Sequence, residues 1–325
     1  MSGPAPLLAI RGLNVAFGPA ERSVPAVADA ELTLSPGEIL GIAGESGSGK
    51  STLCGAIMRT LPRSARVSGE VSFMGRDLLA LEEREMAKLR GRTLSMVLQN
   101  PMTSLDPLYT IGNQVKEVLR ERRRDGVALR PGGAVEVLRR VHLTAPEMRL
   151  GQYPHQLSGG MRQRVLIGMA TAAAPRLLIA DEPTTALDAS IQDEILILFR
   201  ELREAAGSAV IIVTHDLSAI RRLSDRAIIM YAGRIVEEGP TAEVFAAPSH
   251  PYTRALLDSL PRIEAEEVHL RAIPGQVPDL AQLPPGCAFA ARCPVAQPVC
   301  RMHQPEESAV GERHRVFCWQ AGAAA

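Results

Sequence analysis

The sequence predicts an α/β protein whose central sheet is mostly parallel. Short, continuously apolar runs recur over the first 245 residues, as expected for strands buried on both faces of a sheet. Amphipathic helical patterns alternate with these runs. From about Pro107 the chain is rich in Arg, Glu and helix formers, so we expect an inserted helical subdomain over about residues 107–165.

Individual elements follow from these patterns. Strands are expected in the runs GEILGIAG, TLSMVLQ, RLLIADEP and AVIIVTHD, which begin at residues 37, 93, 176 and 209. Helices are expected over Ser51 to Leu61 and Ala189 to Ala206. The run DRAIIMYAGRIVEEG, from residue 225, is typical of a strand, a turn and a second strand.

The character of the chain changes near residue 245. Beyond Pro248 it becomes rich in Pro and Cys, with PPGCAFAARCP at its centre. A length of 325 residues suits one large domain with an appendage. We therefore expect a first domain over residues 1–245 and a small Cys- and Pro-rich C-terminal extension over residues 246–325.

Charge and hydropathy exclude several functions. Lys plus Arg and Asp plus Glu both number 36, which argues against nucleic-acid binding and against direct adhesion to anionic lipid. The most apolar stretches fall short of the roughly 20 residues that cross a bilayer, and the N-terminus does not match a secretory signal. We expect a cytosolic chain that reaches a membrane only through a protein partner.

A glycine-rich segment after the first expected buried strand predicts a phosphate-binding loop. It fits G-x-x-x-x-G-K-[ST] and lies between a strand and a helix, the context that separates this motif from a chance glycine-rich turn. Its backbone N–H groups and the positive end of the helix would bind phosphates, Lys50 would reach the β- and γ-phosphates, and Ser51 would bind Mg²⁺. The expected nucleotide-binding residues are Gly44, Glu45, Ser46, Gly47, Ser48, Gly49, Lys50, Ser51 and Thr52.

Two adjacent carboxylates end the expected strand LLIAD and predict hydrolysis. Asp181 can hold the water shell of the magnesium ion, and Glu182 can polarise the attacking water. Acidic residues at strand ends are often only solvated, so this interpretation depends on the phosphate-binding loop being present.

The stretch LSGGMRQR, from Leu157 to Arg164, resembles the signature motif of ABC ATPases. Ser158 suits a helix N-cap, and the two glycines, Gly159 and Gly160, expose backbone beside it. The resemblance implies an ABC-type ATPase domain with an antiparallel β subdomain. In that family the signature of one subunit covers the γ-phosphate held by the loop of another, so ATP hydrolysis requires a face-to-face dimer.

Four further residues match the family pattern in order. Gln99 resembles the Q-loop glutamine that senses Mg²⁺ and links the site to the transmembrane partner, and Asp188 resembles the D-loop acid at the dimer interface. His215 is similar to the switch histidine that contacts the γ-phosphate and positions Glu182. Phe17 resembles the aromatic that stacks on adenine, although an aromatic in an early strand can equally belong to the core.

Two further motifs resemble the dipeptide and oligopeptide importer branch. They are QNPMTSLDP, from Gln99 to Pro107, and HPYTRALL, from His250 to Leu257. The branch implies a peripheral subunit on the cytoplasmic face of the inner membrane that powers peptide uptake. Its expected partners are a second homologous ATPase, two transmembrane permease subunits and an extracytoplasmic substrate-binding protein. Nickel or another small solute remains an alternative substrate. A soluble ABC ATPase that takes no part in transport is a further alternative function.

Four of the five cysteines lie in the last 39 residues, at Cys287, Cys293, Cys300 and Cys318. Four thiolates in a short Pro-rich segment can enclose a metal centre, and similar sets in this branch bind a [4Fe–4S] cluster. Structural zinc sites favour closer C-x₂₋₄-C pairs, and simple reduced thiols are the third possibility. Cys54 is expected to be a small core residue.

Overall fold

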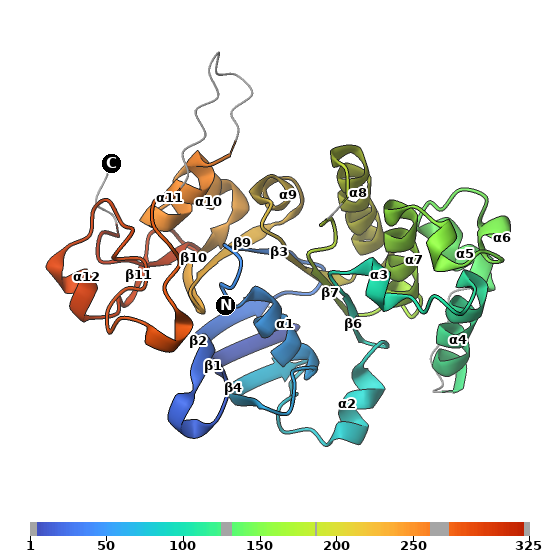
Figure 1. Cartoon of the computed structure of the whole chain (residues 1–325), viewed down its shortest axis with the longest axis horizontal. Helices are drawn as coiled ribbons and strands as arrows, with labels where there is room; N and C mark the ends of the chain where they lie inside the picture. Colours follow the sequence, from blue (N-terminus) through green and yellow to red (C-terminus); the bar gives the residue numbers. More distant parts are fainter. Residues whose placement is uncertain (1–4, 125–131, 186, 261–272, 322–325) are drawn as a thin grey trace, which may run out of the picture. The chain divides into compact units, whose positions relative to one another are not determined.

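The computed structural model describes residues 5–124, 132–185, 187–260 and 273–321 (Figure 1). The chain forms two compact units that do not follow chain order. Unit 1 comprises residues 1–7, 34–39 and 77–213, and unit 2 comprises residues 8–33, 40–76 and 214–325. The ends of the expected domains, at residues 1 and 325, lie outside the described residues. So do residues 125–131 of the expected helical subdomain, residue 186 of the first domain and residues 261–272 of the extension. These domain boundaries stay predictions.

Unit 1 is built on three parallel strands, β6 (Leu94–Val97), β7 (Leu177–Asp181) and β8 (Ala209–Val213). They lie in the order β6-β7-β8, with Leu94 opposite Leu177 and Leu177 opposite Ala209. Every residue of β7 and β8 is buried. This burial explains why both strands are continuously apolar up to Asp181, and it confirms the predicted strands.

Helices of unit 1 pack beside these strands. Those within residues 101–171, between β6 and β7 in the chain, form the helical part of the unit. The longest, α8, has the predicted bounds because Asp188 caps its N-terminus and Gly207, at φ 63°, ends it in the left-handed conformation. The unit 1 helices are α2 (Glu83–Leu89), α3 (Pro101–Ser104), α4 (Ile111–Arg124), α5 (Gly133–Arg140), α6 (Pro146–Arg149), the 3₁₀ turn η2 (Pro154–Gln156), α7 (Gly159–Thr171) and α8 (Ala189–Ala206).

Unit 2 contains a mixed sheet and a separate antiparallel sheet. The mixed sheet has the order β3-β9-β10-β12-β11, in which β3 and β9 are parallel and the remaining neighbours antiparallel. The second sheet places β1 between β2 and β4, and the short β5 follows β4 along the chain. The bounds are β1 (Leu8–Phe17), β2 (Val24–Leu34), β3 (Ile39–Ala43), β4 (Ala65–Phe73), β5 (Arg76–Asp77), β9 (Arg226–Tyr231), β10 (Arg234–Pro240), β11 (Glu307–Ala309) and β12 (Arg315–Phe317).

The helices of unit 2 are short. The helix after the glycine-rich segment ends three residues before the predicted Leu61, because Arg59 turns left-handed at φ 51°. None of the described helices is long and apolar enough to cross a membrane. The helices are η1 (Ala20–Arg22), α1 (Lys50–Met58), α9 (Leu217–Leu223), α10 (Thr241–Ala246), α11 (Pro251–Asp258), η3 (Leu280–Gln282) and α12 (Pro298–Met302).

The C-terminal extension shares its core with β9. Tyr231 of β9, Tyr252 of α11 and Phe289 of the Cys-rich segment are at most 1% exposed and pack with ring centroids 4.5 to 5.3 Å apart. Their mutual tilts suit aromatic packing. A segment with few aliphatic residues thereby obtains a hydrophobic core from the strands before it. In Figure 1 this region (orange to red) lies beside β10.

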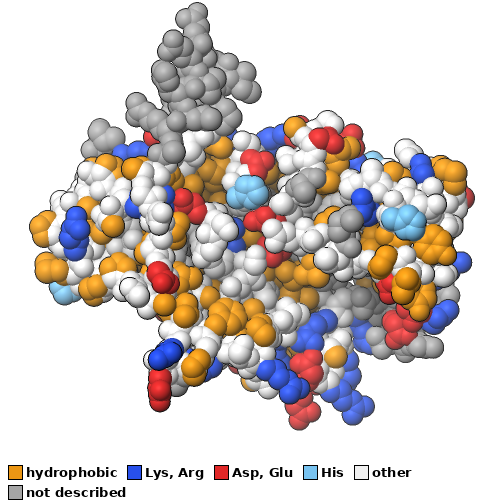
Figure 2. Space-filling model, viewed as in Figure 1, with side chains coloured by type: hydrophobic (Ala, Val, Ile, Leu, Met, Phe, Trp, Pro, Cys, Tyr) orange, Lys and Arg blue, Asp and Glu red, His pale blue; other side chains and the backbone are white. Residues whose placement is uncertain are grey.

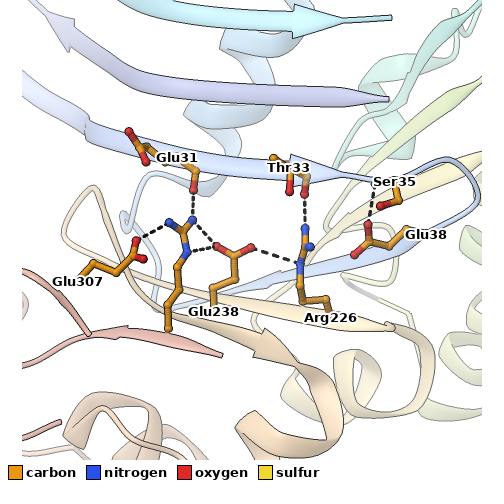
Figure 3. A network of polar contacts seen from close by, with 8 residues as sticks. Glu31, Thr33, Ser35, Glu38, Arg226, Glu238 and Glu307 are labelled. Atoms are coloured by element: carbon orange, nitrogen blue, oxygen red, sulfur yellow. Dashed lines mark hydrogen bonds and ion pairs between the residues drawn. The ribbon is translucent and has the colours of Figure 1, made fainter. Parts of the chain in front are cut away.

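Glu238 of β10 holds the extension through a buried ion network (Figure 3). Its carboxylate lies 3.3 Å from Nε of Arg226 and accepts a 2.8 Å hydrogen bond from Nε of Arg315, the residue opposite it on β12. Arg226 also donates to the Thr33 carbonyl, and Arg315 donates to Glu31 of β2 and Glu307 of β11. The network therefore ties five strands of unit 2 together.

The neighbouring Glu237 is fully buried and binds two further parts of the extension, its start and the segment before β12. Its carboxylate accepts hydrogen bonds from the backbone N–H groups of Ser249 (2.7 Å) and His250 (3.0 Å) and lies 2.8 Å from Nε2 of His314. Burial alone would raise the pKa of Glu237, but the hydrogen bonds from His314 and from these two N–H groups lower it.

His250 begins α11 as its N-cap, with Nδ1 accepting a 3.0 Å hydrogen bond from the Tyr252 N–H. The ring is 1% exposed, and burial lowers the pKa of His250 from 6.5 to about 4, although the Glu237 carboxylate opposes this shift. The neutral imidazole is therefore the form that the fold accommodates.

We predict that the folded chain loses stability as pH falls from 7 to 5. The unfolded chain takes up a proton on His250 near pH 6.5, whereas the folded chain resists it until about pH 4, so the contribution is complete above 6.5 and declines below it. The loss from this residue is about 2 kcal/mol over that interval. Urea unfolding at a series of pH values measures it.

His250→Asn is the matched control. Asparagine can keep the N-cap hydrogen bond but does not titrate, so the variant should be less stable at pH 7 and should show a flatter slope between pH 7 and 5. Equal slopes in the two proteins would contradict the assignment.

Candidate nucleotide-binding site

The predicted phosphate-binding loop follows the buried strand β3 in unit 2. Gly44 adopts φ 153° and Gly49 φ 100°, and a Cβ at these positions would lie 2.2 Å from the Met230 carbonyl oxygen and 2.4 Å from that of Ala26. Both glycines are therefore required by close backbone packing as well as by conformation. The loop closes on α1, whose N-cap, Gly49, has no side chain to occupy the helix end.

Lys50 lies under this loop at the first position of α1. Its Nζ donates hydrogen bonds to the carbonyl oxygens of Gly44 (2.8 Å) and Glu45 (2.9 Å), and it lies 3.4 Å from the hydroxyl of Ser48. Lys50 and Ser48 are buried, whereas Ser46, Gly47 and Ser51 are exposed and Thr52 is half-buried. An ammonium group held by the loop backbone is suitably placed for a phosphate chain.

Glu45 has contacts that the sequence did not reveal. Its backbone N–H donates a 2.9 Å hydrogen bond to the Tyr252 hydroxyl, and its carboxylate forms a two-point ion pair with Arg292, at 2.7 and 3.1 Å. Burial raises the pKa of Tyr252 well above its usual value, so its hydroxyl stays protonated. The motif HPYT offered a signal, but only as a mark of the transporter branch; nothing in the sequence distinguishes Arg292.

In unit 1 the two predicted carboxylates follow one another at the end of β7. Asp181 is 6% exposed at the last position of the strand. Glu182 turns left-handed at φ 46°, a costly conformation for a non-glycine residue, and its N–H donates a 2.8 Å hydrogen bond to the Val213 carbonyl. The turn directs the chain out of the sheet directly after Asp181.

Gln99 and Glu182 lie together, although 83 positions separate them in the chain. Nε2 of Gln99 donates a 3.0 Å hydrogen bond to Oε2 of Glu182, and the Thr185 hydroxyl donates to the same oxygen at 2.8 Å. These two hydrogen bonds fix the position of the Glu182 carboxylate. Thr185 was not among the predicted site residues.

The signature stretch begins α7 as expected. Ser158 caps the helix, its hydroxyl accepting a 3.3 Å hydrogen bond from the Met161 N–H. Gly160 is buried, and a Cβ there would lie 2.6 Å from Cγ2 of Ile191 on α8. Close packing of α7 on α8 therefore requires this glycine, a reason beyond the exposed backbone predicted from sequence. Gly159 is half-buried beside Leu187.

The remaining predicted residues are Asp188, His215 and Phe17. Asp188 caps α8, and hydrogen bonds from the Ile191 N–H and the Ser190 hydroxyl lower its pKa. His215 is exposed, and Phe17, at the end of β1, is half-buried. Their roles at a dimer interface, at the γ-phosphate and at adenine stay predictions.

The four C-terminal cysteines gather near one another around Cys287. Burial, together with the nearby Cys318, Cys300 and Cys293, raises the pKa of the Cys287 thiol to about 11; burial also raises the pKa of Cys293 and Cys318. Soft sulfur donors suit an iron–sulfur centre. However, no group of three or more His, Cys, Asp or Glu side chains among the described residues is arranged to hold a metal ion. The expected cluster is therefore not confirmed. Cys54, as predicted, is fully buried.

Comparisons with known proteins identify the family. Residues 27–185 match the ABC transporter family and residues 236–300 match the oligopeptide/dipeptide transporter C-terminal region. The chain is 46% identical over 318 residues to a probable peptide ABC transporter ATP-binding protein of Sinorhizobium fredii, covering 97% of this chain and 95% of the relative. The chain belongs to the ABC transporter ATP-binding proteins. The oligopeptide transport ATP-binding protein OppD of Salmonella typhimurium is 44% identical over 302 residues, 93% of this chain and 90% of that protein.

Solved structures of ABC ATPases share the fold. A post-hydrolysis dimer of the ATP-binding cassette MJ0796, bound to ADP and Pi, aligns with a TM-score of 0.61 and 29% identity over 72% of this chain and 98% of that one. The cbiO1 subunit from Clostridium perfringens aligns with the same TM-score and 26% identity over 75% and 92%. Membership of this family makes the chain an ATP-hydrolysing subunit and confirms the predicted fold class.

The family resemblance implies how the site residues act. Bound Mg²⁺ would neutralise phosphate charge, and the resemblance gives Ser51 and Gln99 as its ligands and Asp181 behind its water shell; these roles stay predictions. Lys50 and the loop backbone can bind phosphates, while Glu182, held by Gln99 and Thr185, can accept a hydrogen bond from the attacking water.

We predict that Glu182→Gln keeps ATP binding and lowers steady-state hydrolysis by about 100-fold or more. The amide keeps the size of the side chain but is a poor acceptor for the proton of water. Titration with ATP and a phosphate-release assay measure the two effects. Glu204→Gln, at an exposed position of α8, is the matched control and should leave both unchanged; undiminished hydrolysis in Glu182→Gln would contradict the assignment.

Proposed function

We propose that this chain hydrolyses ATP to power the import of peptides as one ATP-binding subunit of an ABC transporter. The observation that carries the proposal is the joint match to the ABC family and to the oligopeptide/dipeptide C-terminal region, with peptide-transport relatives aligned over more than nine-tenths of the chain. The complete set of expected ATP-site residues supports an active ATPase.

The proposed partners are two permease subunits, a substrate-binding protein and a second, homologous ATPase, with this chain held peripherally at the cytoplasmic face of the membrane. Exposed apolar side chains of unit 1 support contact with a permease: Leu98, which precedes Gln99 in the chain, Leu108 and Tyr109 are 52%, 79% and 55% exposed. Figure 2 shows further hydrophobic side chains (orange) over the helical part of unit 1. The dimeric state of the solved cassette MJ0796 supports pairing of two ATPases.

Reconstitution tests the proposed function. With its permeases, paired ATPase and binding protein in proteoliposomes, the chain should drive ATP-dependent uptake of labelled di- and oligopeptides, and Glu182→Gln should abolish it. Uptake of nickel without peptide would replace the substrate assignment and leave the ATPase assignment intact. ATP hydrolysis that no permease stimulates would overturn the transport role.

We also propose that Cys287, Cys293, Cys300 and Cys318 bind a [4Fe–4S] cluster. Their proximity and sulfur chemistry support the proposal, and the thiols would have to rearrange and lose their protons to bind iron. Protein purified without oxygen should show visible charge-transfer absorbance and about four irons per chain. Cys293→Ser should lose both and Cys54→Ala should keep both. A colourless protein with stoichiometric zinc would overturn the proposal.

A further inference from the structure

Glu45 lies in the phosphate-binding loop, and its N–H, its carbonyl oxygen and its carboxylate each form a hydrogen bond or an ion pair. Tyr252 accepts from its N–H, Lys50 donates to its carbonyl oxygen at 2.9 Å, and Arg292 binds both carboxylate oxygens. The same residue therefore contacts the lysine expected to bind phosphate and two side chains of the C-terminal extension.

The carboxylate of Glu45 places a negative charge in a loop that is expected to bind anions. It is partly exposed, at 26%, and a negative charge there would repel the phosphates of a nucleotide. The Arg292 guanidinium neutralises this charge with a two-point contact, the geometry that fixes both direction and distance of a carboxylate.

Arg292 is itself held in place by the extension and β9. Its Nε and Nη2 donate to the carbonyl oxygens of Pro274 (2.9 Å) and Ile273 (3.3 Å), and Nη1 donates to the Tyr231 hydroxyl (3.2 Å). The guanidinium carbon also lies 5.8 and 5.9 Å from the ring centroids of Tyr231 and Phe289. With its side chain 5% exposed, Arg292 has little freedom to move to another partner.

We propose that Arg292 is a positioning residue of the nucleotide site, through which the C-terminal extension neutralises and fixes Glu45 and so sets the affinity of the loop for ATP. The inference rests on ATP binding by this loop. It makes the extension part of the ATP-binding machinery, although no residue of the extension need touch the nucleotide.

Arg315 provides a matched comparison within the same extension. It also forms a partly buried ion pair, with Glu238, but among the described residues its polar contacts go to β2, β10 and β11 and none to the loop. A purely structural role predicts similar effects of the two arginines. A positioning role predicts that only Arg292 changes nucleotide affinity.

The experiment compares Arg292→Met with Arg315→Met in the full chain. Calorimetric titration with Mg·ATP and Mg·ADP gives affinity, and urea unfolding gives stability. Both variants should lose stability, but only Arg292→Met should weaken nucleotide binding, by about tenfold, a usual size for coupling between distinct groups. Equal affinity in Arg292→Met and the unaltered chain would overturn the proposal, and failure of the unaltered chain to bind ATP would instead overturn the proposed function.

Two further variants test whether Arg292 acts through Glu45 and keep the proposal falsifiable if Arg292→Met folds poorly. Arg292→Lys keeps the charge but loses the two-point contact, so its affinity should be intermediate. Glu45→Gln combined with Arg292→Met removes the charge that repels phosphate and should bind ATP more tightly than Arg292→Met alone. A double variant as weak as Arg292→Met would contradict the proposed route.

Discussion

Unit 2 depends on two adjacent carboxylates in β10. Successive side chains of a strand point to opposite faces, so Glu237 and Glu238 bind different parts of the chain from one short segment. Glu237 holds the start of α11 and His314, while Glu238 joins β9, β2 and the C-terminal β12. Both are buried at 5% exposure or less, and a buried charge deprived of its partners costs several kcal/mol. The extension is therefore attached by partners that each carboxylate requires.

This attachment explains how the extension reaches the nucleotide site. Tyr252 stands two residues after His250, whose N–H Glu237 binds, and its hydroxyl meets the phosphate-binding loop. The aromatic cluster of Tyr231, Tyr252 and Phe289 then places Arg292 beside Glu45. A hydrophobic core, two buried carboxylates and one guanidinium thus connect the last quarter of the chain to the residues expected to bind ATP.

Local sequence patterns were enough to predict the fold class, many of the elements and the candidate site residues, whose roles stay predictions. The buried strands, the bounds of α8 and the cap at Ser158 follow from apolar runs and capping chemistry, which depend on neighbouring residues. Contacts between distant positions could not be predicted from such local patterns. Arg292 and Glu45 are 247 positions apart in the chain, and Gly160 of α7 is required by its contact with Ile191 of α8. The cysteines show a second limit, because their spacing indicates donors but does not fix the ligand geometry.

The pairing of β12 with β10 also bears on where the chain can be cut. A chain ended near residue 245 would leave the outer side of β10 without its partner strand, exposing unpaired backbone groups along an apolar edge with two newly hydrated carboxylates. Such edges recruit other strands, so self-association is the expected fate of the shortened protein. The outermost strand of the intact sheet, β11, has only three residues, and this brevity gives neighbouring molecules little to pair with.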